Sequence, residues 1–199
     1  MLSMDLNARQ LLVEAAERVQ LLPYSWPSPP DATSARDTGR GTCAAKHALL
    51  REFLLEVGLR CSRILVVGPL APDLWPDLQT KAGALMEVHE CLTVETEWAG
   101  PLLVDVTWHP VAVAAGLPGT LNWDGRSDMV CAVNPVASYA LAHEYFRDQK
   151  ERLRARLYTS DQRLLRDTIL AEIAHRAEGL TRNPATPPQP DLSDHLSMY

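Results

Sequence analysis

The sequence predicts an α+β fold in which a central helix packs on an antiparallel sheet and further helices follow towards the C-terminus. Three observations lead to this prediction. Residues 43–57 form a helical run that is apolar almost all round, which is typical of a helix buried at the centre of a domain. The segments 85–95 and 101–108 read as strands joined by a short turn, which indicates an antiparallel hairpin. Helical patterns precede and follow these strands, so the order along the chain is that of an α+β domain.

Length, composition and charge describe one ordinary globular domain. The chain has 199 residues, of which 46% are hydrophobic and 22% are charged, and a chain of this kind can bury a sizeable core. We predict a single domain over residues 1–180 and a Pro-rich, disordered tail over residues 181–199. The net charge of −6 argues against a general nucleic-acid binder, which needs a basic surface.

The sequence shows no pattern typical of a membrane span or a secretion signal. No apolar run approaches the roughly 20 residues that cross a bilayer. The first residues, MLSMDLNARQ, contain no basic segment followed by an apolar stretch. We therefore predict a cytoplasmic protein that has neither a membrane nor nucleic acid as a partner and whose thiols stay free.

The N-terminal part of the chain is predicted to hold two helices separated by a loop. Apolar side chains recur at helical spacing over residues 5–22, which predicts an opening helix. The prolines and small polar residues of 23–41 predict an irregular surface loop. The central helix then runs from Cys43 to Val57, and Gly58 is suited to end it.

Strands are predicted in the middle of the chain and helices after them. The strands are expected from short apolar or alternating segments, and the helices from apolar residues at helical spacing. Ser160 is expected to cap the last helix and Gly179 to end it. The predicted strands are residues 62–68, 85–95, 101–108 and 129–133, and the predicted helices are residues 138–157 and 160–178.

The predicted hairpin places a histidine beside an aspartate. If the hairpin turns about residue 97, residue i faces residue 194 − i, so His89 lies opposite Asp105 on the same face of the sheet. A carboxylate in this position fixes the tautomer of an imidazole and favours its protonated form. The pair therefore has the make-up of a base and the group that orients it.

Cys43 lies at the mouth of the central helix, directly after Gly41 and Thr42. A helix N-terminus and an adjacent imidazolium both stabilise a thiolate. We therefore predict Cys43 as the nucleophile, His89 as its base and Asp105 as the orienting group. The alternative is ordinary packing, because a cysteine in an apolar helix is usually inert.

The other polar candidates are assigned no chemistry. Lys46 shares the first helical turn with Cys43, where it either adds positive potential near the thiolate or is solvated. The remaining cysteines are predicted to be free packing thiols. The remaining histidines show no metal-ligand spacing, so neither a metal nor another cofactor is expected. These residues are Cys61, Cys91 and Cys131, and His47, His143, His175 and His195.

The motifs resemble the core of the transglutaminase-like superfamily, a branch of the papain-like cysteine enzymes. That family has a Gly-x-Cys at the start of a central helix, a strand with histidine, and a strand with aspartate followed by threonine and often tryptophan. The resemblance implies a papain/transglutaminase-like core and acyl transfer or hydrolysis through a thioester. One position departs from the pattern: Cys91 stands where the family often has a large aromatic residue. The matching residues, within about 39–110, are Gly41-Thr42-Cys43, His89 and Asp105-Val106-Thr107-Trp108.

Aromatic residues precede and follow these motifs. We expect the loop 23–41 and the segment 107–125 to form opposite walls of an apolar pocket for a small or acyl substrate. Tyr24 and Trp26 are candidates for a second oxyanion donor beside the backbone N–H of Cys43, because each carries a donor on its ring. The predicted substrate-binding residues are Tyr24, Trp26, Trp108 and Trp123.

The predicted function is thiol-dependent acyl transfer through an acyl-enzyme at Cys43, resolved by an amine or by water. Two alternatives stay open: a peptide or amide hydrolase, and a non-catalytic binding module that uses the cleft for recognition. The expected substrate is a small molecule, a peptide or a carrier-bound acyl group. The stretch 147–166 has seven Lys/Arg against three Asp/Glu, and it is either a solvated helical face or a docking surface for an acidic carrier protein.

Overall fold

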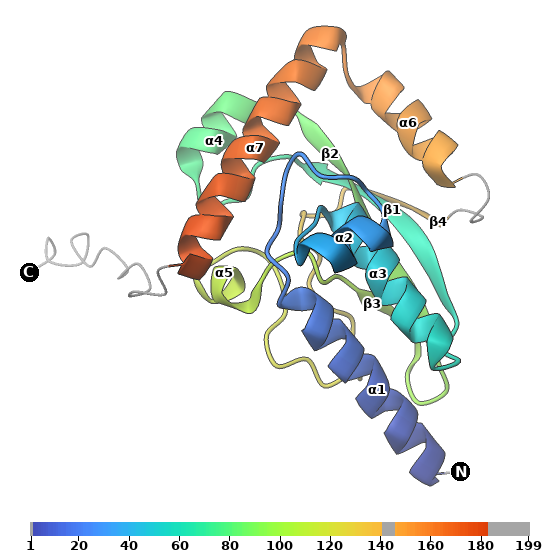
Figure 1. Cartoon of the computed structure of the whole chain (residues 1–199). Helices are drawn as coiled ribbons and strands as arrows, with labels where there is room; N and C mark the ends of the chain where they lie inside the picture. The colour runs from blue at the N-terminus through green and yellow to red at the C-terminus, as the bar shows by residue number, and fades with distance from the viewer. Residues whose placement is uncertain (1, 141–145, 183–199) are drawn as a thin grey trace, which may run out of the picture.

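The structure of the chain is a computed structural model that describes residues 2–140 and 146–182. Within these residues it is an α+β fold with one four-stranded antiparallel sheet and seven helices (Figure 1). The α+β class and the antiparallel sheet predicted from the sequence are confirmed. The sheet order is β3-β2-β1-β4. The strands are β1 (Cys61–Pro69), β2 (Met86–Thr96), β3 (Gly100–Val104) and β4 (Ala137–Ala140), and the helices are α1 (Leu2–Gln20), α2 (Ala32–Thr38), α3 (Cys43–Glu56), α4 (Pro76–Ala82), α5 (Pro110–Ala114), α6 (Phe146–Leu157) and α7 (Ser160–Arg182).

α3 is the central helix. It packs on β2, and α1 and α2 lie against it (Figure 1). Its start is capped by Thr42, whose hydroxyl oxygen accepts a hydrogen bond from the N–H of Ala45 at 3.2 Å. Leu50 is fully buried in the main core between these elements. The helix ends at Glu56, and Gly58 follows with a φ of 79°, so the predicted helix and its stop are confirmed.

β2 and β3 form the predicted hairpin, but in a different register. Leu92 faces Val104, so residue i faces residue 196 − i and not 194 − i. β3 ends at Val104, and Asp105 lies just beyond the paired residues, contrary to the predicted strand 101–108. A shift of two residues leaves every side chain on its original face. This is why His89 and Asp105 still lie on a common side.

The segment 129–133 is not a strand, so that prediction was wrong. It runs beside β3 and is held at separate points: the N–H of Met129 donates to the carbonyl of Leu103 at 2.9 Å. The N–H of Leu103 in turn donates to the carboxylate of Asp128 at 2.7 Å. The fourth strand is β4, which pairs with β1. The irregular segment carries Cys131 past the end of β3.

The N-terminal half differs from the prediction at two further places. α1 ends at Gln20, two residues before the predicted limit of 22. The predicted loop 23–41 contains α2, because Asp31 caps its start by accepting a hydrogen bond from the N–H of Ser34 at 2.9 Å. Gly39, with a φ of 65°, ends this short helix.

The C-terminal helices also differ from their predicted limits. The helix predicted over 138–157 overlaps β4, and α6 begins at Phe146; residues 141–145 lie outside the described residues. At the start of α7 the backbone N–H of Gln162 donates to the hydroxyl oxygen of Thr159 at 3.3 Å, and the backbone N–H of Thr159 donates to the side-chain oxygen of Gln162 at 2.8 Å. Thr159 therefore takes the role predicted for Ser160. α7 continues through Gly179 to Arg182. The tail predicted to be disordered lies outside the described residues from 183 onwards.

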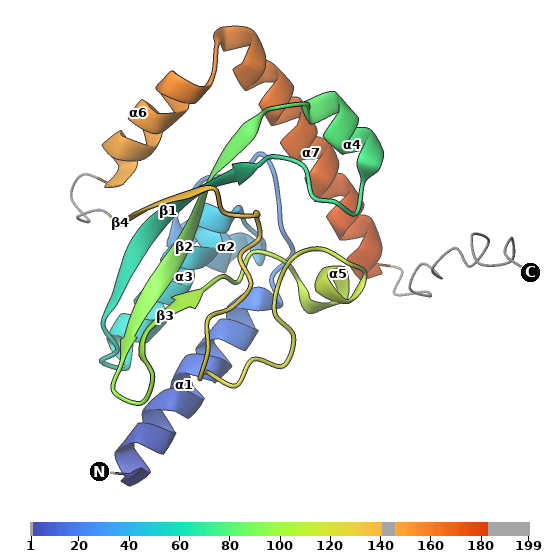
Figure 2. The same ribbon diagram turned by 180° about the vertical axis from the view of Figure 1, so that it is seen from behind.

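α6 and α7 lie over one end of the sheet (Figures 1 and 2). Phe146 of α6 is buried against Val67 of β1 and Val88 of β2. α7 packs on α4 and α5 through buried residues such as Ile169 and Ile173. The helices and the sheet thereby enclose a space above the start of α3. Among the described residues, no helix combines the length and the apolar character needed to cross a membrane.

Candidate active site

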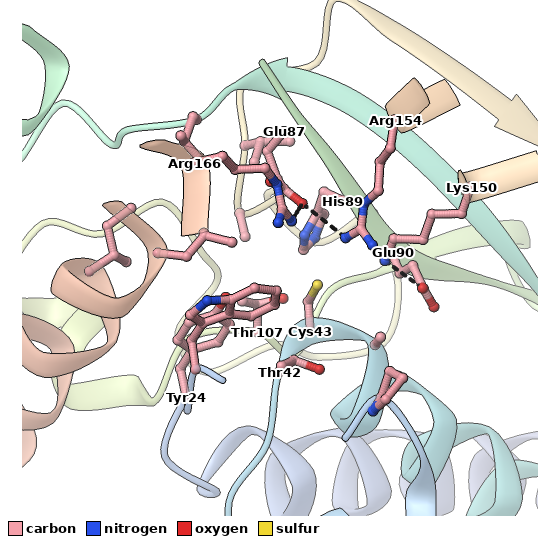
Figure 3. Close-up of a pocket in the computed structure, with 18 of the residues that line it drawn as sticks. Tyr24, Thr42, Cys43, Glu87, His89, Glu90, Thr107, Lys150, Arg154 and Arg166 are labelled. Atoms are coloured by element: carbon pink, nitrogen blue, oxygen red, sulfur yellow. Dashed lines mark hydrogen bonds and ion pairs between the residues drawn. The ribbon is translucent and has the colours of Figure 1, made fainter. Parts of the chain in front are cut away.

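Cys43 is the first residue of α3 and lines a cavity of about 450 Å³ (Figure 3). The loop before it must come very close to α3, because a Cβ on Gly41 would lie 3.0 Å from the Cβ of Ala45. Tyr24 pairs with Gly41 in a short parallel bridge and also lines the cavity. The motif Gly41-Thr42-Cys43 therefore starts the helix and holds Tyr24 beside that start.

The structure brings the predicted base and orienting group together. Nε2 of His89 donates to Oδ2 of Asp105 at 2.7 Å, and both side chains are buried. Asp105 also accepts hydrogen bonds from the N–H of Thr107 at 3.0 Å and from that of Ala132 at 2.8 Å. Burial on its own raises the pKa of Asp105, but the attraction and hydrogen bond of His89 hold it well below its usual range. Asp105 is therefore ionised.

Cys43 and His89 each favour the charged form of the other. Burial on its own lowers the pKa of His89, but the negative charges of Asp105 and Cys43 raise it well above its ordinary value. Burial likewise raises the pKa of Cys43, but the positive charges of His89 and, more weakly, Lys150 bring it below the ordinary value. Figure 3 shows the sulfur of Cys43 pointing towards the His89 ring. The two groups are thus suited to form a thiolate–imidazolium pair.

Sequence reasoning missed His47, which lies one turn after Cys43 on α3 and is fully buried. Its Nδ1 donates to the carbonyl of Cys43 at 2.7 Å, and its Nε2 accepts from the N–H of Val106 at 3.1 Å. One partner can only accept and the other can only donate, so the ring is a neutral tautomer with its hydrogen on Nδ1. Burial lowers the pKa of His47 to about 4 despite the attraction of Asp105. His47 therefore connects α3 to the end of β3 without carrying charge.

Lys46 is not solvated, so that reading of the sequence was wrong. It is 0% exposed, and its ammonium donates to the carbonyls of Leu22 at 2.7 Å, Thr107 at 2.8 Å and Gln20 at 3.3 Å. Burial lowers its pKa to about 7, although the charge of Asp105 acts in the opposite direction. The side chain ties the end of α1 and the segment after β3 to the first turn of α3.

Two cysteines lie next to the His89–Asp105 pair. Cys91 and Cys131 are buried, and the hydrogen bond between their thiols lowers the pKa of Cys131 and raises that of Cys91. One ligand atom from each of the four residues lies within 4.8 Å of the others. Such a donor set suits zinc, whose bonds are about 2.0–2.3 Å long. A zinc ion bound through Nε2 of His89 would replace the proton that this nitrogen donates to Asp105, so Nε2 cannot serve both the metal and the hydrogen bond.

Three of the four predicted substrate-binding aromatic residues line the cavity. Tyr24 and Trp108 pack with their ring centroids 4.8 Å apart, and Trp26 packs against the same hydrophobic cluster. Burial raises the pKa of Tyr24 well above its ordinary value, so its hydroxyl stays protonated and can donate. Trp123 instead is buried in the main core against α1 and does not line the cavity. The segment 107–125 thus lines the cavity through its first residues alone. Because Tyr24 and Trp108 pack on each other, this segment and the loop 23–41 lie side by side, and the prediction that they form opposite walls was wrong.

The far wall of the cavity is charged, a feature that sequence reasoning did not find. Both oxygens of Glu87 accept hydrogen bonds from Arg166, each at 2.6 Å. Glu90 accepts from Lys150 at 2.6 Å and from Arg63 at 3.0 Å. Figure 3 shows that Lys150 reaches the carboxylate from α6. The partners come from β1, α6 and α7, so this wall forms when the C-terminal helices close over the sheet.

The basic stretch 147–166 is divided between this wall and the surface. Lys150 and Arg166 are buried, and Arg154 is partly buried with its guanidinium 3.6 Å from Glu87. Four of the cations considered for carrier docking, these three and the exposed Arg147, therefore line the cavity. The exposed cations of the stretch are Arg147, Arg152, Arg156 and Arg163.

Comparisons of the chain with protein-family models, with curated proteins and with solved structures find no significant match. The chemistry of the site is therefore inferred from its own geometry. A thiol with a lowered pKa stands at a helix N-terminus, beside a charged imidazole and inside a cavity of ligand size. This arrangement is equipped for nucleophilic attack on an electrophilic carbon.

Proposed function

We propose that the chain is a cysteine enzyme that forms an acyl-enzyme at Cys43 and passes the acyl group to an amine or to water. The observation that carries this proposal is the hydrogen-bonded pair of His89 and Asp105 next to the thiol. An inert packing cysteine needs neither a lowered pKa nor an ionised partner beside it. The proposed function therefore explains two features that packing alone leaves unexplained, the lowered pKa of Cys43 and the ionised partner beside it.

In the first step, the thiolate of Cys43 attacks the carbonyl carbon of an amide or thioester and a C–S bond forms. The backbone N–H of Cys43, at the N-terminus of α3, stabilises the oxyanion. The imidazolium of His89 then gives its proton to the leaving amine or thiol as the old bond breaks. In the second step, neutral His89 takes a proton from an amine or a water that attacks the thioester, and Cys43 leaves as a thiolate.

Tyr24 is the better supported of the two candidates for the second oxyanion donor. Its pKa is raised first by burial and next by the negative charge of Cys43, so the phenol stays protonated. Trp26 instead stacks against Arg166, whose guanidinium lies 5.1 Å from the ring centroid. Tyr24 therefore lines the same cavity as Cys43, pairs with Gly41 just before it, and has the protonation state needed to donate to an oxyanion.

The arrangement also supports the transglutaminase-like resemblance as part of this proposal. A Gly-x-Cys opens the central helix, the histidine lies on a strand of an antiparallel sheet, and the aspartate follows the adjacent strand. Enzymes of this kind need no cofactor, because the three side chains carry nucleophile, proton transfer and orientation. The fold alone does not define the acceptor of the acyl group.

Selective alkylation tests whether Cys43 is an activated nucleophile. Iodoacetamide at neutral pH should modify Cys43 first, while Cys61, whose pKa is raised by burial, lags behind. Peptide mass spectrometry measures the order of labelling, and Cys43→Ala identifies the labelled site. Equally slow labelling of all four thiols would contradict the proposal and favour a non-catalytic binding module.

Trapping of the acyl-enzyme tests the reaction itself. Incubation with a panel of acyl thioesters should add one acyl group to the intact mass of the protein but not to Cys43→Ala. An amine challenge then decides between the two acceptors: an amide product identifies a transferase, and release of free acid alone identifies a hydrolase. Absence of any adduct despite fast iodoacetamide labelling would contradict acyl transfer.

A further inference from the structure

The charges around the cavity do not balance. The chain carries a net charge of −6, whereas the side chains that line the cavity include five cations and three carboxylates. The local charge therefore has the opposite sign to that of the whole chain. The cations are Arg63, Arg147, Lys150, Arg154 and Arg166, and the carboxylates are Glu87, Glu90 and Glu151.

Glu87 is shared by two guanidinium groups. Arg166 occupies both of its oxygens in a bidentate pair at 2.6 Å, which satisfies that carboxylate. Arg154 then lies 3.6 Å away, too far for a hydrogen bond of ordinary length. The cluster keeps one positive charge, and it belongs to the group that is less well bonded, Arg154.

Glu90 repeats this arrangement with Lys150 at 2.6 Å and Arg63 at 3.0 Å. The two clusters together hold two more cations than carboxylates. The group of Cys43, His89 and Asp105, counted as thiolate, imidazolium and carboxylate, contributes one negative charge. One positive charge remains in the cavity, and it persists in the acyl-enzyme, because His89 gives up its proton as the charge of the thiolate is consumed. Unbalanced charge in a partly buried place is costly unless a ligand compensates it.

Arg154 is the cation best placed to bind that ligand. Its other partner is Glu151 at 3.0 Å, and that carboxylate is 54% exposed while the Arg154 side chain is 19% exposed; such surface pairs are weak. Its Nε is buried and has no hydrogen-bond partner in the described part of the chain. Figure 3 shows Arg154 reaching down from α6 between Glu87 and Glu90, on the side of the cavity where His89 lies.

We propose that the acyl group transferred by this site carries an anion, a carboxylate or a phosphate, that Arg154 binds inside the cavity. This inference rests on the acyl-enzyme function proposed for Cys43. It assigns α6 a role in specificity: the helix closes one side of the cavity and presents a guanidinium to the substrate. The planar donors of arginine suit either anion, because both accept two parallel hydrogen bonds.

Alkylating probes of similar size test whether the cavity prefers an anionic group, and they do so without knowledge of the substrate. N-iodoacetyl-glycine and N-iodoacetyl-glycinamide share the same reactive carbon and differ in a terminal carboxylate or amide. The ratio of their rate constants at Cys43, measured by intact mass, is compared with the ratio for N-acetylcysteine at the same pH and salt. We expect the carboxylate probe to be favoured at Cys43 by about tenfold relative to that reference. N-iodoacetyl-aminomethylphosphonate, as a third probe, shows which of the two anions is preferred.

Two variants test whether the preference for an anionic probe depends on the side chain of Arg154. Arg154→Gln should lower the ratio close to that of N-acetylcysteine, whereas Arg156→Gln should leave it unchanged, because Arg156 is exposed on the same helix and does not line the cavity. Fast labelling of the unsubstituted protein by the amide probe with no preference for either anion would overturn this inference and leave the acyl-enzyme proposal standing. Slow labelling by all three probes would contradict the acyl-enzyme proposal itself.

Discussion

The two sides of Asp105 hold histidines in opposite charge states. On the α3 side, Nε2 of His47 lies 3.6 Å from the carboxylate, and on the β2 side Nε2 of His89 lies 2.7 Å from it. The ring centroids are 6.0 Å apart. Burial lowers the pKa of His47 to about 4. Burial acts on His89 in the same sense, yet the charges of Asp105 and Cys43 raise its pKa well above the ordinary value.

The hydrogen-bond partners account for this difference. His47 is bonded to two backbone groups, the carbonyl of Cys43 and the N–H of Val106, and these require one donor and one acceptor on the ring. His89 instead donates to a carboxylate and stands near a second negative charge, which favours the ring with both nitrogens protonated. Burial alone therefore does not define the role of a histidine; its partners do.

The two histidines beside Asp105 therefore differ in role: His47 supports the structure, and His89 is suited to proton transfer. His47 holds the start of α3 against the segment after β3, and so it positions Cys43 without taking part in proton transfer. His89 is the group that can exchange a proton with the thiol. The two histidines should therefore respond to substitution in different measurements, reactivity for His89 and stability for His47.

The largest effect is expected for His89→Ala. Loss of the imidazole removes both the charge that lowers the pKa of Cys43 and the proton donor, so acylation of Cys43 should slow by about 10²- to 10⁴-fold. Intact mass spectrometry of samples quenched at successive times after addition of an acyl thioester measures this rate. His175→Ala is the matched control, because His175 is exposed on α7. A loss of less than about fivefold in the His89 variant would contradict the assignment of His89 as the base.

His47→Ala should act on stability. It leaves a buried carbonyl and a buried N–H without their partner and opens a small cavity, so the free energy of unfolding should fall by about 2–4 kcal/mol. Urea denaturation at pH 7 measures this change. The alkylation rate of Cys43, taken well below the unfolding midpoint, should change by less than about tenfold. Equal loss of reactivity in the two histidine variants would break the proposed division between them.

The arrangement of Cys43, His89 and Asp105, the proposed reactive group, could be predicted from the sequence because each of these residues lies in a short motif. The predicted register was wrong by two residues, yet His89 and Asp105 kept a common face because the error was even. The turn itself explains the error: Thr96 accepts a hydrogen bond from the N–H of Ala99 at 3.2 Å and donates to Gly100 at 2.6 Å. The hairpin is thereby centred one residue later than expected.

The surroundings of that group could not be predicted. Glu87 and Arg166 are 79 positions apart, and Lys150 lies 60 positions after Glu90. In the sequence these cations look like the polar face of a solvated helix, and only the packing of α6 and α7 turns them inward. Trp123 shows the reverse error, since closeness in sequence to Asp105 suggested a cavity wall and the side chain instead fills the main core.

The pH dependence of stability separates the two histidines further. His47 is neutral in the folded protein down to pH about 4, whereas in the unfolded chain it gains a proton below about pH 6.5. The unfolded state therefore binds more protons between these values, and the free energy of unfolding falls by up to about 3 kcal/mol as pH drops from 6.5 to 4. His89 acts in another window: its contribution is complete below about pH 6.5 and is lost as pH rises through its raised pKa.

Urea denaturation of the unsubstituted protein and of His47→Ala at several pH values measures the His47 contribution, because effects of other groups cancel in the difference. The stability gap between the two proteins should shrink by about 3 kcal/mol between pH 6.5 and pH 4. A gap that stays constant over this range would show that His47 is protonated in the folded protein, and the contrast with His89 would be lost.

The smallest effect is expected for Asp105→Asn, which keeps the size of the side chain and removes the charge between the two histidines. Without that carboxylate, burial lowers the pKa of His89, the imidazole loses its charge, and the pKa of Cys43 rises because its own burial is no longer opposed. Iodoacetamide labelling of Cys43 near pH 6.5 should therefore slow by about tenfold, which corresponds to a rise of one unit in the pKa of the thiol. The difference in rate between the two proteins should shrink as pH rises further, because the thiol then becomes ionised in both. Cys61 serves as the internal reference, since its pKa is raised by burial and its largest charged influence is Arg51.

A labelling profile of Cys43 that does not move along the pH axis would show that Asp105 leaves the charge of His89 unchanged. The carboxylate would then orient the ring without controlling its proton.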